Sequence, residues 1–196
     1  MITGRRTGPL EEAKANLDKL ASELGYKVKV TTISGDAEQN ETYIKLREHV
    51  EKEHDGRLDA LICNAGPGKS SPGSWSPMLP DQPVEDWDST IGVNLNGPYY
   101  AARQLIPLLL KSEGRTIVNV VSGAAHMTKG NPPIAYALSK FAESRLTQNI
   151  GEVYADKGLQ AFALHPGAVR TPSSTNAMPE EMQACKSRSS RVLRSL

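Results

Sequence analysis

Residues 116–140, TIVNVVSGAAHMTKGNPPIAYALSK, contain a strand, a loop and the start of a helix in direct succession. Thr116 to Val121 is apolar and β-branched, which is typical of a buried strand. Ser122 follows this strand, and a loop rich in glycine and proline leads to a helix predicted from Ala135 to Ala155. A strand followed by a long helix indicates one unit of a parallel α/β sheet.

The same alternation of strand and helix patterns runs along most of the chain. Strands are predicted at residues 26–33, 58–63, 116–121 and 159–164, and helices at residues 9–24, 37–54, 84–111 and 135–155. Pro98 and Pro107 should bend or interrupt the third of these helices. The pattern predicts an α/β fold in three layers, a doubly wound parallel sheet with helices on both faces.

Polar and turn-forming residues follow the predicted strands at the point where each strand ends. Asp36, Asn64, Ser122 and the pair Pro166-Gly167 each come directly after a strand pattern. Ligands of open parallel sheets bind beyond the carboxyl ends of the strands. We therefore expect these residues to lie along one functional edge.

Tyr136 and Lys140 stand four residues apart on the predicted helix, so both side chains share a face. A free tyrosine has a pKa of about 10, and lowering it by about three units needs roughly 4 kcal/mol. One positive charge at about 4 Å supplies roughly that amount at an effective dielectric near 20. The pair can therefore form an acid–base catalyst; the alternative is an exposed helix face that carries both residues by chance.

The composition favours a soluble globular protein. The chain has 196 residues, a formal net charge of +1 and two cysteines, Cys63 and Cys185. A charge this small gives no long-range attraction to nucleic acid or to an anionic membrane. The N-terminus lacks the apolar core of a signal peptide, and no apolar run is long enough to span a bilayer. We expect a cytoplasmic protein with no metal site.

Together the motifs resemble those of the short-chain dehydrogenase/reductase family. The matching segments are Asn64-Ala65-Gly66, Asn94-Leu95-Asn96-Gly97, Ser122, Tyr136 to Lys140, and Pro166-Gly167 with Thr171. The resemblance covers roughly residues 1–175 and implies a single Rossmann-like domain. Ala184 to Leu196 is basic and rich in serine, and we expect a divergent, flexible tail over residues 176–196.

The resemblance implies a catalytic role for four of these residues. Tyr136 would be the general acid–base that protonates a carbonyl oxygen or deprotonates an alcohol. Ser122 would hydrogen-bond the same oxygen and stabilise its developing charge. Lys140 would lower the pKa of the tyrosine and bind the nicotinamide ribose. Asn94 would hold a water molecule that connects Lys140 to solvent.

The resemblance also implies a set of residues that bind a dinucleotide. Asn64, Ala65 and Gly66 would let the backbone approach the cofactor, and Gly66 suits a close approach or a positive φ. Asp36 would bond the adenine ring. Pro166, Gly167 and Thr171 would contact the nicotinamide end, together with Tyr136 and Lys140.

Arg5 and Arg6 bear on the choice between NADP and NAD. They follow Ile2-Thr3-Gly4, which is similar to the end of the family's second strand. Arginine at this place accommodates a 2′-phosphate, whereas an acidic residue would favour NAD. The residues therefore favour NADP, with NAD as the alternative. If they have no function, Arg5 and Arg6 are simply two solvated basic residues.

The chain departs from the family pattern because the glycine-rich phosphate loop is missing. Thr3 to Leu10 does not fit that loop, since leucine stands where glycine is needed and Pro9 lacks a backbone donor. In the strand order 3-2-1-4-5-6, strand 1 is central. Without it, the first two strands of this chain should have no partner that joins them to the others. We expect a form truncated at both ends that binds dinucleotide poorly.

The favoured function is hydride transfer between NADP(H) and a carbonyl compound or a secondary alcohol. The alternative is a truncated, catalytically inactive interaction module. A weaker third option is an epimerase or dehydratase, which would need a larger substrate domain than this chain can hold. The pocket would be flanked by Trp75, Met78, His126, Met127 and residues 168–178. By resemblance, a full-length protein would be a homodimer or homotetramer that pairs through the helices at 84–111 and 135–155.

Overall fold

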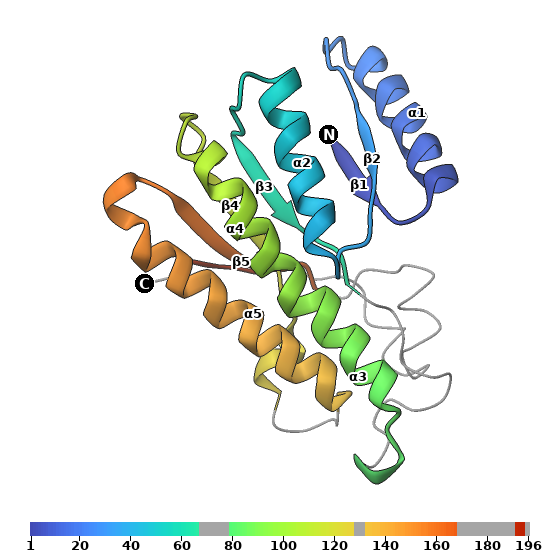
Figure 1. Cartoon of the computed structure of the whole chain (residues 1–196), viewed down its shortest axis with the longest axis vertical. Coiled ribbons are helices and arrows are strands. Elements are labelled where there is room, and N and C mark those ends of the chain that lie inside the picture. The colour runs from blue at the N-terminus through green and yellow to red at the C-terminus, as the bar shows by residue number, and fades with distance from the viewer. Residues whose placement is uncertain (67–78, 128–131, 168–190, 195–196) are drawn as a thin grey trace.

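A computed structural model describes residues 1–66, 79–127, 132–167 and 191–194 (Figure 1). The strands and α-helices are β1 (Ile2–Gly4), α1 (Thr7–Glu23), β2 (Thr32–Ser34), α2 (Asn40–Glu53), β3 (Ala60–Cys63), α3 (Val84–Ile91), α4 (Gly97–Leu109), β4 (Thr116–Val120), α5 (Ile134–Val153), β5 (Gln160–His165) and β6 (Arg191–Arg194). The short helical turns are η1 (Leu79–Asp81), η2 (Gly92–Asn96), η3 (Gly123–His126) and η4 (Ala155–Lys157). Strands and helices alternate as the sequence predicts.

The strands form two separate sheets. β1 and β2 pair in parallel, and β3, β4 and β5 form a second parallel sheet to which β6 adds in the antiparallel direction. No strand in the described part of the chain joins β1 to β3. The expected separation of the first two strands from the others is therefore confirmed.

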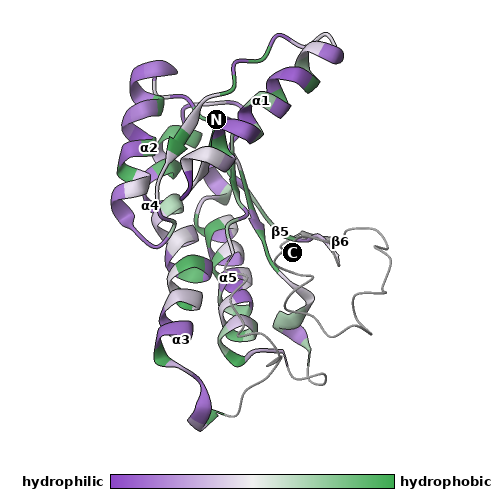
Figure 2. Ribbon diagram, turned by 90° about the vertical axis from the view of Figure 1, so that its right-hand side faces the viewer, coloured by the Kyte–Doolittle hydropathy of each residue, from purple (hydrophilic) through white to green (hydrophobic). Residues whose placement is uncertain are grey.

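The helices cover opposite faces of the strands, as in a doubly wound fold. Figure 2 shows α2 and α4 on one side of the strands and α1 on the other. α1 packs on β1 and β2, whereas α5 packs on β5 and α2 packs on α4. The predicted three-layer α/β architecture is confirmed for the described residues.

The core lies between the larger sheet and the helices α2, α4 and α5. One cluster joins α4 and α5 to β4 and β5, and its buried members are Ala102, Ile106, Leu109, Ile117, Ile150, Leu159 and Ala161. A second cluster joins α2 to α4 through Leu46, Val50, Leu105 and Leu108. Leu58 and Leu61 pack against both clusters. α4 is therefore buried on two sides, which fixes the position of the segment that precedes it.

The helix predicted over residues 84–111 is interrupted by the five-residue π-helix η2 (Gly92–Asn96). Pro98 lies in the first turn of α4 and has no N–H to bond the carbonyl of Asn94 four residues earlier. The helix is therefore wider at this point. Such π-bulges in α-helices are often found at functional sites. Pro107 stays inside α4, so only the first proline coincides with an interruption.

Two segments differ from the sequence prediction. The strand predicted at residues 26–33 is reduced to Thr32–Ser34, because β1 offers only three residues for pairing and Val28 is exposed. In the expected tail, Arg191–Arg194 form β6 beside β5, and the rest of residues 176–196 lies outside the described residues. Among the described helices, none has the length and hydrophobicity that a membrane span requires.

Candidate active site

The register of the larger sheet brings three strand ends to one edge. Cys63 of β3 is level with Asn119 of β4, and Val120 is level with Leu164 of β5. Since these strands are parallel, Asn64, Ser122 and Pro166-Gly167 leave the sheet on the same side. The predicted meeting of these residues at one edge is therefore seen in the fold.

The smaller sheet presents its own carboxyl edge to the same region. Gly4 pairs with Ser34, so Arg5 and Asp36 both follow this edge. The turn after Asp36 lies against the end of α3 and the start of η2. The Ser89 hydroxyl of α3 donates to Glu38 Oε1 at 3.1 Å, and Gly92 of η2 lies close to the Glu38 side chain. A β-carbon on Gly97 would lie 2.8 Å from the Ala37 carbonyl oxygen, so this contact requires glycine. The contact explains why Gly97 follows the polar residues of η2.

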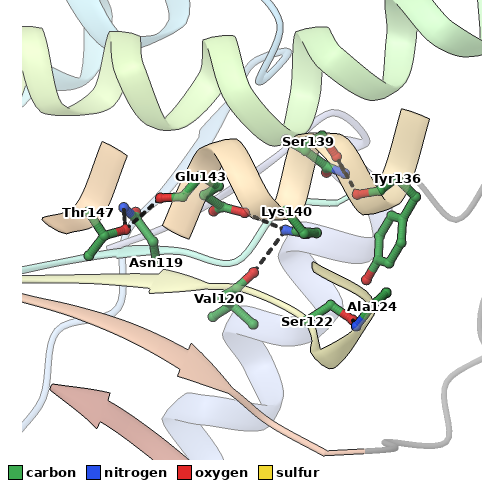
Figure 3. Close-up of polar contacts among 10 residues, drawn as sticks. Asn119, Val120, Ser122, Ala124, Tyr136, Ser139, Lys140, Glu143 and Thr147 are labelled. Atoms are coloured by element: carbon green, nitrogen blue, oxygen red, sulfur yellow. Dashed lines mark hydrogen bonds and ion pairs between the residues drawn. The ribbon is translucent and has the colours of Figure 1, made fainter. Parts of the chain in front are cut away.

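Tyr136 and Ser122 face each other across the site. Tyr136 lies in the first turn of α5, and its ring extends toward the turn that carries Ser122 (Figure 3). Ser122 is the N-cap of η3, and its Oγ accepts a hydrogen bond from the Ala124 backbone N–H at 3.2 Å. Both residues are half-buried. A substrate oxygen placed between them would meet two hydroxyl groups.

Lys140 lies one turn after Tyr136, but its ammonium is directed away from the phenol (Figure 3). Lys140 Nζ donates to the Val120 carbonyl oxygen at 2.8 Å and to Glu143 Oε2 at 2.7 Å. The side chains of Lys140 and Glu143 are only 5% and 1% exposed. A buried ammonium needs such partners, because an unpaired charge in the interior is costly. The expected orientation of Lys140 toward Tyr136 is therefore not the one seen.

Burial is the main influence on the pKa of Glu143. Burial raises this pKa from 4.5 to about 7, although the charge of Lys140 and the hydrogen bond from Lys140 act in the opposite direction. Cys63, half-buried at the end of β3, lies near the same charges. Burial, followed by the charge of Glu143, raises the pKa of its thiol to about 12. Cys63 therefore stays a neutral thiol beside the ion pair.

Asn94 is fully buried in η2 and contacts α5. Its Nδ2 donates to Ser139 Oγ at 2.9 Å, and the Ser139 hydroxyl donates to the Tyr136 carbonyl oxygen at 2.8 Å. Asn94 Oδ1 has no hydrogen-bond partner among the described residues. The π-helix thus presents one open amide acceptor beside the first turn of α5.

The residues expected at the adenosine end lie at the smaller sheet. Arg5 and Arg6 are exposed, and the Arg5 carbonyl oxygen accepts from the Ser34 hydroxyl at 3.2 Å. Asp36 Oδ1 accepts from the Glu38 backbone N–H at 3.1 Å and so shapes its own turn. The guanidinium groups therefore remain accessible, whereas one oxygen of Asp36 is engaged.

The glycines at the strand ends behave differently from one another. Asn64, Ala65 and Gly66 are exposed after β3. The positive φ considered for Gly66 is wrong, and a β-carbon there would meet Asn94 Oδ1 at an ordinary 3.5 Å. Gly167 has a φ of 78°, a conformation that disfavours other residues. Glycine is thus required after Pro166, whereas the expected approach of the Gly66 backbone to a cofactor stays a prediction.

Several expected pocket residues lie outside the described part of the chain. These are Thr171, Trp75, Met78 and residues 168–178. His126 and Met127 are described and exposed, and the His126 ring contacts Phe141 edge-on with centroids 5.9 Å apart. Of the residues expected around the pocket, only His126 and Met127 are thus described, and their role in a pocket stays a prediction.

Three polar residues at the site were not assigned a role from the sequence. Glu143 and Ser139 contact Lys140 and Asn94, and His165 accepts a hydrogen bond from the turn of Ser122. The spacing of Glu143 from Lys140, three residues on one helix, was a signal available in the sequence. His165 offered no such signal, because its partner is 42 residues away.

Comparison with known proteins identifies the family. The family model for short chain dehydrogenases matches residues 3–182. The chain is 42% identical over 185 residues to the short chain dehydrogenase pgmD of Aspergillus terreus, which covers 93% of this chain and 59% of that protein. It is 35% identical over 118 residues to 2-dehydro-3-deoxy-L-rhamnonate dehydrogenase (NAD(+)) of a Sphingomonas species, covering 60% of this chain and 45% of that one.

Solved structures agree with this result. A short chain dehydrogenase from Shigella flexneri complexed with NADP is similar with a TM-score of 0.76 at 26% identity, over 91% of this chain and 70% of that one. The chain spans 59% of the length of the pgmD protein, so it corresponds to part of that relative. The extent of the family match, together with the strand-edge site, shows that this chain belongs to the short-chain dehydrogenase family.

Proposed function

We propose that the protein transfers hydride between NADP(H) and a carbonyl compound or a secondary alcohol. The observation that carries the proposal is the placement of the Tyr136 phenol toward the turn of Ser122 (Figure 3). Two hydroxyl groups at the edge of a parallel sheet can hold one substrate oxygen from two sides. An inactive interaction module gives no reason for this convergence.

The dinucleotide fits the residues present at both of its ends. Exposed Arg5 and Arg6 suit an adenosine 2′-phosphate, and the open Oδ1 of Asn94 can accept from a water molecule or a hydroxyl group. The described residues include no glycine-rich turn before a helix for the diphosphate, and the N-cap of α1, Arg6, makes no side-chain capping bond. These residues therefore support binding at the two ends of the cofactor. Because the diphosphate has no such turn, we expect the cofactor to bind weakly.

In the direction of reduction, Tyr136 gives its phenolic proton to the carbonyl oxygen. Ser122 Oγ already accepts from Ala124, so its own proton is available to donate to the same oxygen. The nicotinamide ring supplies the hydride when it is bound. The negative charge that develops on oxygen is thus met by two donors, and the reverse steps oxidise an alcohol.

Lys140 and Asn94 help to hold the helix that carries Tyr136 in place. The buried Lys140 side chain binds Glu143 and the Val120 carbonyl oxygen, and so joins the helical face that carries Tyr136 to the end of β4. Ser139 connects Asn94 to the carbonyl of Tyr136 and so holds the first turn of α5 against η2. A water molecule on Asn94 Oδ1 would complete a route by which the site exchanges protons with solvent.

NADP is proposed over NAD because of the two arginines. Similar proteins carry printed names with either cofactor, NAD(+) for the Sphingomonas enzyme and NADP for the Shigella structure. Neither name decides the preference of this chain. A direct comparison of binding constants for NADPH and NADH does, and we expect NADPH to bind at least tenfold more tightly, because a bidentate arginine contact to phosphate is strong.

Association into a homodimer or homotetramer is proposed through the faces of α4 and α5. Tyr99 is 47% exposed on α4, and Leu138 and Phe141 are 50% and 53% exposed on α5. Large exposed apolar side chains grouped on neighbouring elements are typical of interaction surfaces. Light scattering of the purified chain tests this, and a monomer at micromolar concentration would contradict it.

The function is tested by turnover of a panel of ketones and aldehydes with NADPH and NADH. We expect slow turnover that disappears in Tyr136→Phe, which removes the proton donor and keeps the ring. Ser122→Ala should lower kcat by a factor of about 100, the effect of losing one donor to a developing oxyanion. Equal rates for the wild-type protein and Tyr136→Phe would contradict the proposed role of Tyr136.

A further inference from the structure

His165 at the end of β5 makes a hydrogen bond that the sheet does not require. The backbone N–H of Gly123 donates to His165 Nδ1 at 3.2 Å. Gly123 follows Ser122 directly, so the imidazole is joined to the turn that carries the proposed substrate-binding hydroxyl. The bond exists only while Nδ1 carries no proton, which places the ring proton on Nε2.

The bond begins where the pairing of β4 and β5 ends. The last backbone bond between these two segments runs from the Val121 N–H to the Leu164 carbonyl oxygen at 2.9 Å. Two residues later, the backbone would turn the next N–H, that of Gly123, toward the partner strand. The side chain of His165 supplies the acceptor at this position. It therefore continues the hydrogen bonding between the strands by one step past their ends.

The other bonds of the Ser122 turn are internal. Ser122 Oγ accepts from the Ala124 N–H at 3.2 Å, and the Ser122 carbonyl accepts from the Ala125 N–H at 3.1 Å. These two bonds fix the shape of the turn. They do not join the turn to β5. The bond from Gly123 to His165 does so, two residues past the backbone bond of Val121 to Leu164.

The imidazole also packs closely on the turn. A β-carbon on Gly123 would lie 3.2 Å from His165 Nε2 and 3.5 Å from Cε1. The imidazole ring therefore lies against Gly123, and this close packing leaves the ring and the turn little room to move. His165 also precedes Pro166 and the positive-φ Gly167, so the same residue borders both turns at the strand edge.

From these contacts we infer that His165 is a positioning residue that holds the Ser122 hydroxyl in place by accepting the Gly123 N–H. The inference rests on the proposed function for its effect on catalysis, because it assigns Ser122 to the substrate oxygen. His165 itself acts through the backbone of Gly123 and is not placed in contact with the substrate. Its effect on the geometry of the turn does not depend on any cofactor.

Two substitutions separate the acceptor from the bulk of the ring. Asn carries Oδ1 at the same distance along the side chain as His Nδ1, so His165→Asn retains the acceptor. His165→Leu fills similar space without one. His54→Leu, at an exposed histidine after α2, controls for the general loss of an imidazole. Circular dichroism of each variant establishes that it is folded.

Amide hydrogen exchange measured by NMR gives a readout that needs no activity. In His165→Leu we expect exchange at Gly123 and Ala124 to be about tenfold faster than in the wild-type protein, the effect of losing one hydrogen bond. The Ala124 amide reports on Ser122 because it donates to Ser122 Oγ. Exchange at Val121 should not change, which shows that the strands remain paired. His165→Asn and His54→Leu should both resemble the wild-type protein.

The kinetic expectation is a fall in kcat of about tenfold in His165→Leu, with little change in KM for NADPH and recovery in His165→Asn. The inference is overturned if His165→Leu leaves Ala124 exchange unchanged, or if His165→Asn exchanges as fast as His165→Leu. A wild-type chain without turnover would count against the proposed function alone, since the exchange rates still decide the role of His165.

Discussion

The burial of Glu143 predicts that the protein loses stability as the pH rises from about 4.5 to about 7. Its side chain is 1% exposed, and burial raises its pKa to about 7. In this range the folded protein keeps a proton that the unfolded chain has released. The folded state therefore binds more protons than the unfolded state, and its free energy of unfolding falls with increasing pH. The stabilisation is complete below pH 4.5 and is lost above pH 7.

The magnitude follows from the width of this range. A shift of about 2.5 units at 1.36 kcal/mol per unit corresponds to about 3 kcal/mol. The ion pair with Lys140 at 2.7 Å already opposes the shift, so this figure is what remains after the attraction between the two charges. It is a large part of the 5–15 kcal/mol that is typical of a folded domain.

Urea denaturation of the wild-type protein and of Glu143→Gln between pH 4.5 and pH 8 measures the effect. Glutamine has the size of a protonated glutamic acid and does not titrate. We expect the difference in free energy of unfolding between the two proteins to change by about 3 kcal/mol across this range in favour of the variant. Glu152→Gln, an exposed carboxylate on the same helix, should keep the steep pH dependence that Glu143 causes.

A constant difference between Glu143→Gln and the wild-type protein across the whole range would refute the reasoning. A difference that changes in the opposite direction would show that the fold prefers the charged form of Glu143. In that case attraction to Lys140 outweighs the cost of burying the carboxylate.

Three further outcomes are expected. Tyr136→Phe should lower kcat for carbonyl reduction by a factor of about 100 or more, measured by the absorbance of NADPH at saturating substrate. Replacing Arg5 and Arg6 by alanine should raise KM for NADPH roughly tenfold and leave KM for NADH within about twofold, because both residues are exposed and are proposed to bind the 2′-phosphate; equal effects on the two cofactors would contradict this. Leu109→Ala, at a side chain with no exposed surface, should cost about 2–5 kcal/mol in urea unfolding, whereas Ile62→Ala, at a side chain 65% exposed, should cost under about 1 kcal/mol.

The sequence predicted the strand edge and the helix of Tyr136 because both depend on local patterns. Alternating strands and helices imply a parallel sheet, and residues that follow parallel strands must meet at one edge. The four-residue spacing of Tyr136 and Lys140 fixes their shared face in any helix. These features therefore required no knowledge of tertiary packing.

The partners of Lys140 could not be predicted in the same way. Spacing places Glu143 on the same face, but burial of the pair depends on how α5 packs on the end of β4, where Val120 offers its carbonyl. The length of β2 likewise depends on a distant segment, since β1 provides only three residues to pair with it. Long-range packing thus decided what local patterns left open.

The π-helix lies between these two cases. Pro98 predicted an interruption of the helix, but the position of the π-helix at residues 92–96 also depends on contacts outside the helix. Gly92 and Gly97 lie against the turn of residues 36–38. A β-carbon on Gly97 would collide with the Ala37 carbonyl oxygen, and one on Gly92 would lie tightly against the Glu38 side chain. The turn after β2 therefore helps to determine where the helix widens.

The division of the strands into two sheets implies that the molecule opens in stages. Within the first 35 residues, Leu10 and Val30 are the buried hydrophobic side chains, whereas most of the core lies in α2, α4, α5, β4 and β5. Segments with few buried contacts open at lower free energy than the rest of a domain. The N-terminal unit should therefore fray as an independent foldon and expose its chain to proteases first. Since this unit carries Arg5 and Arg6, capture of a nucleotide phosphate would also be an ordering event.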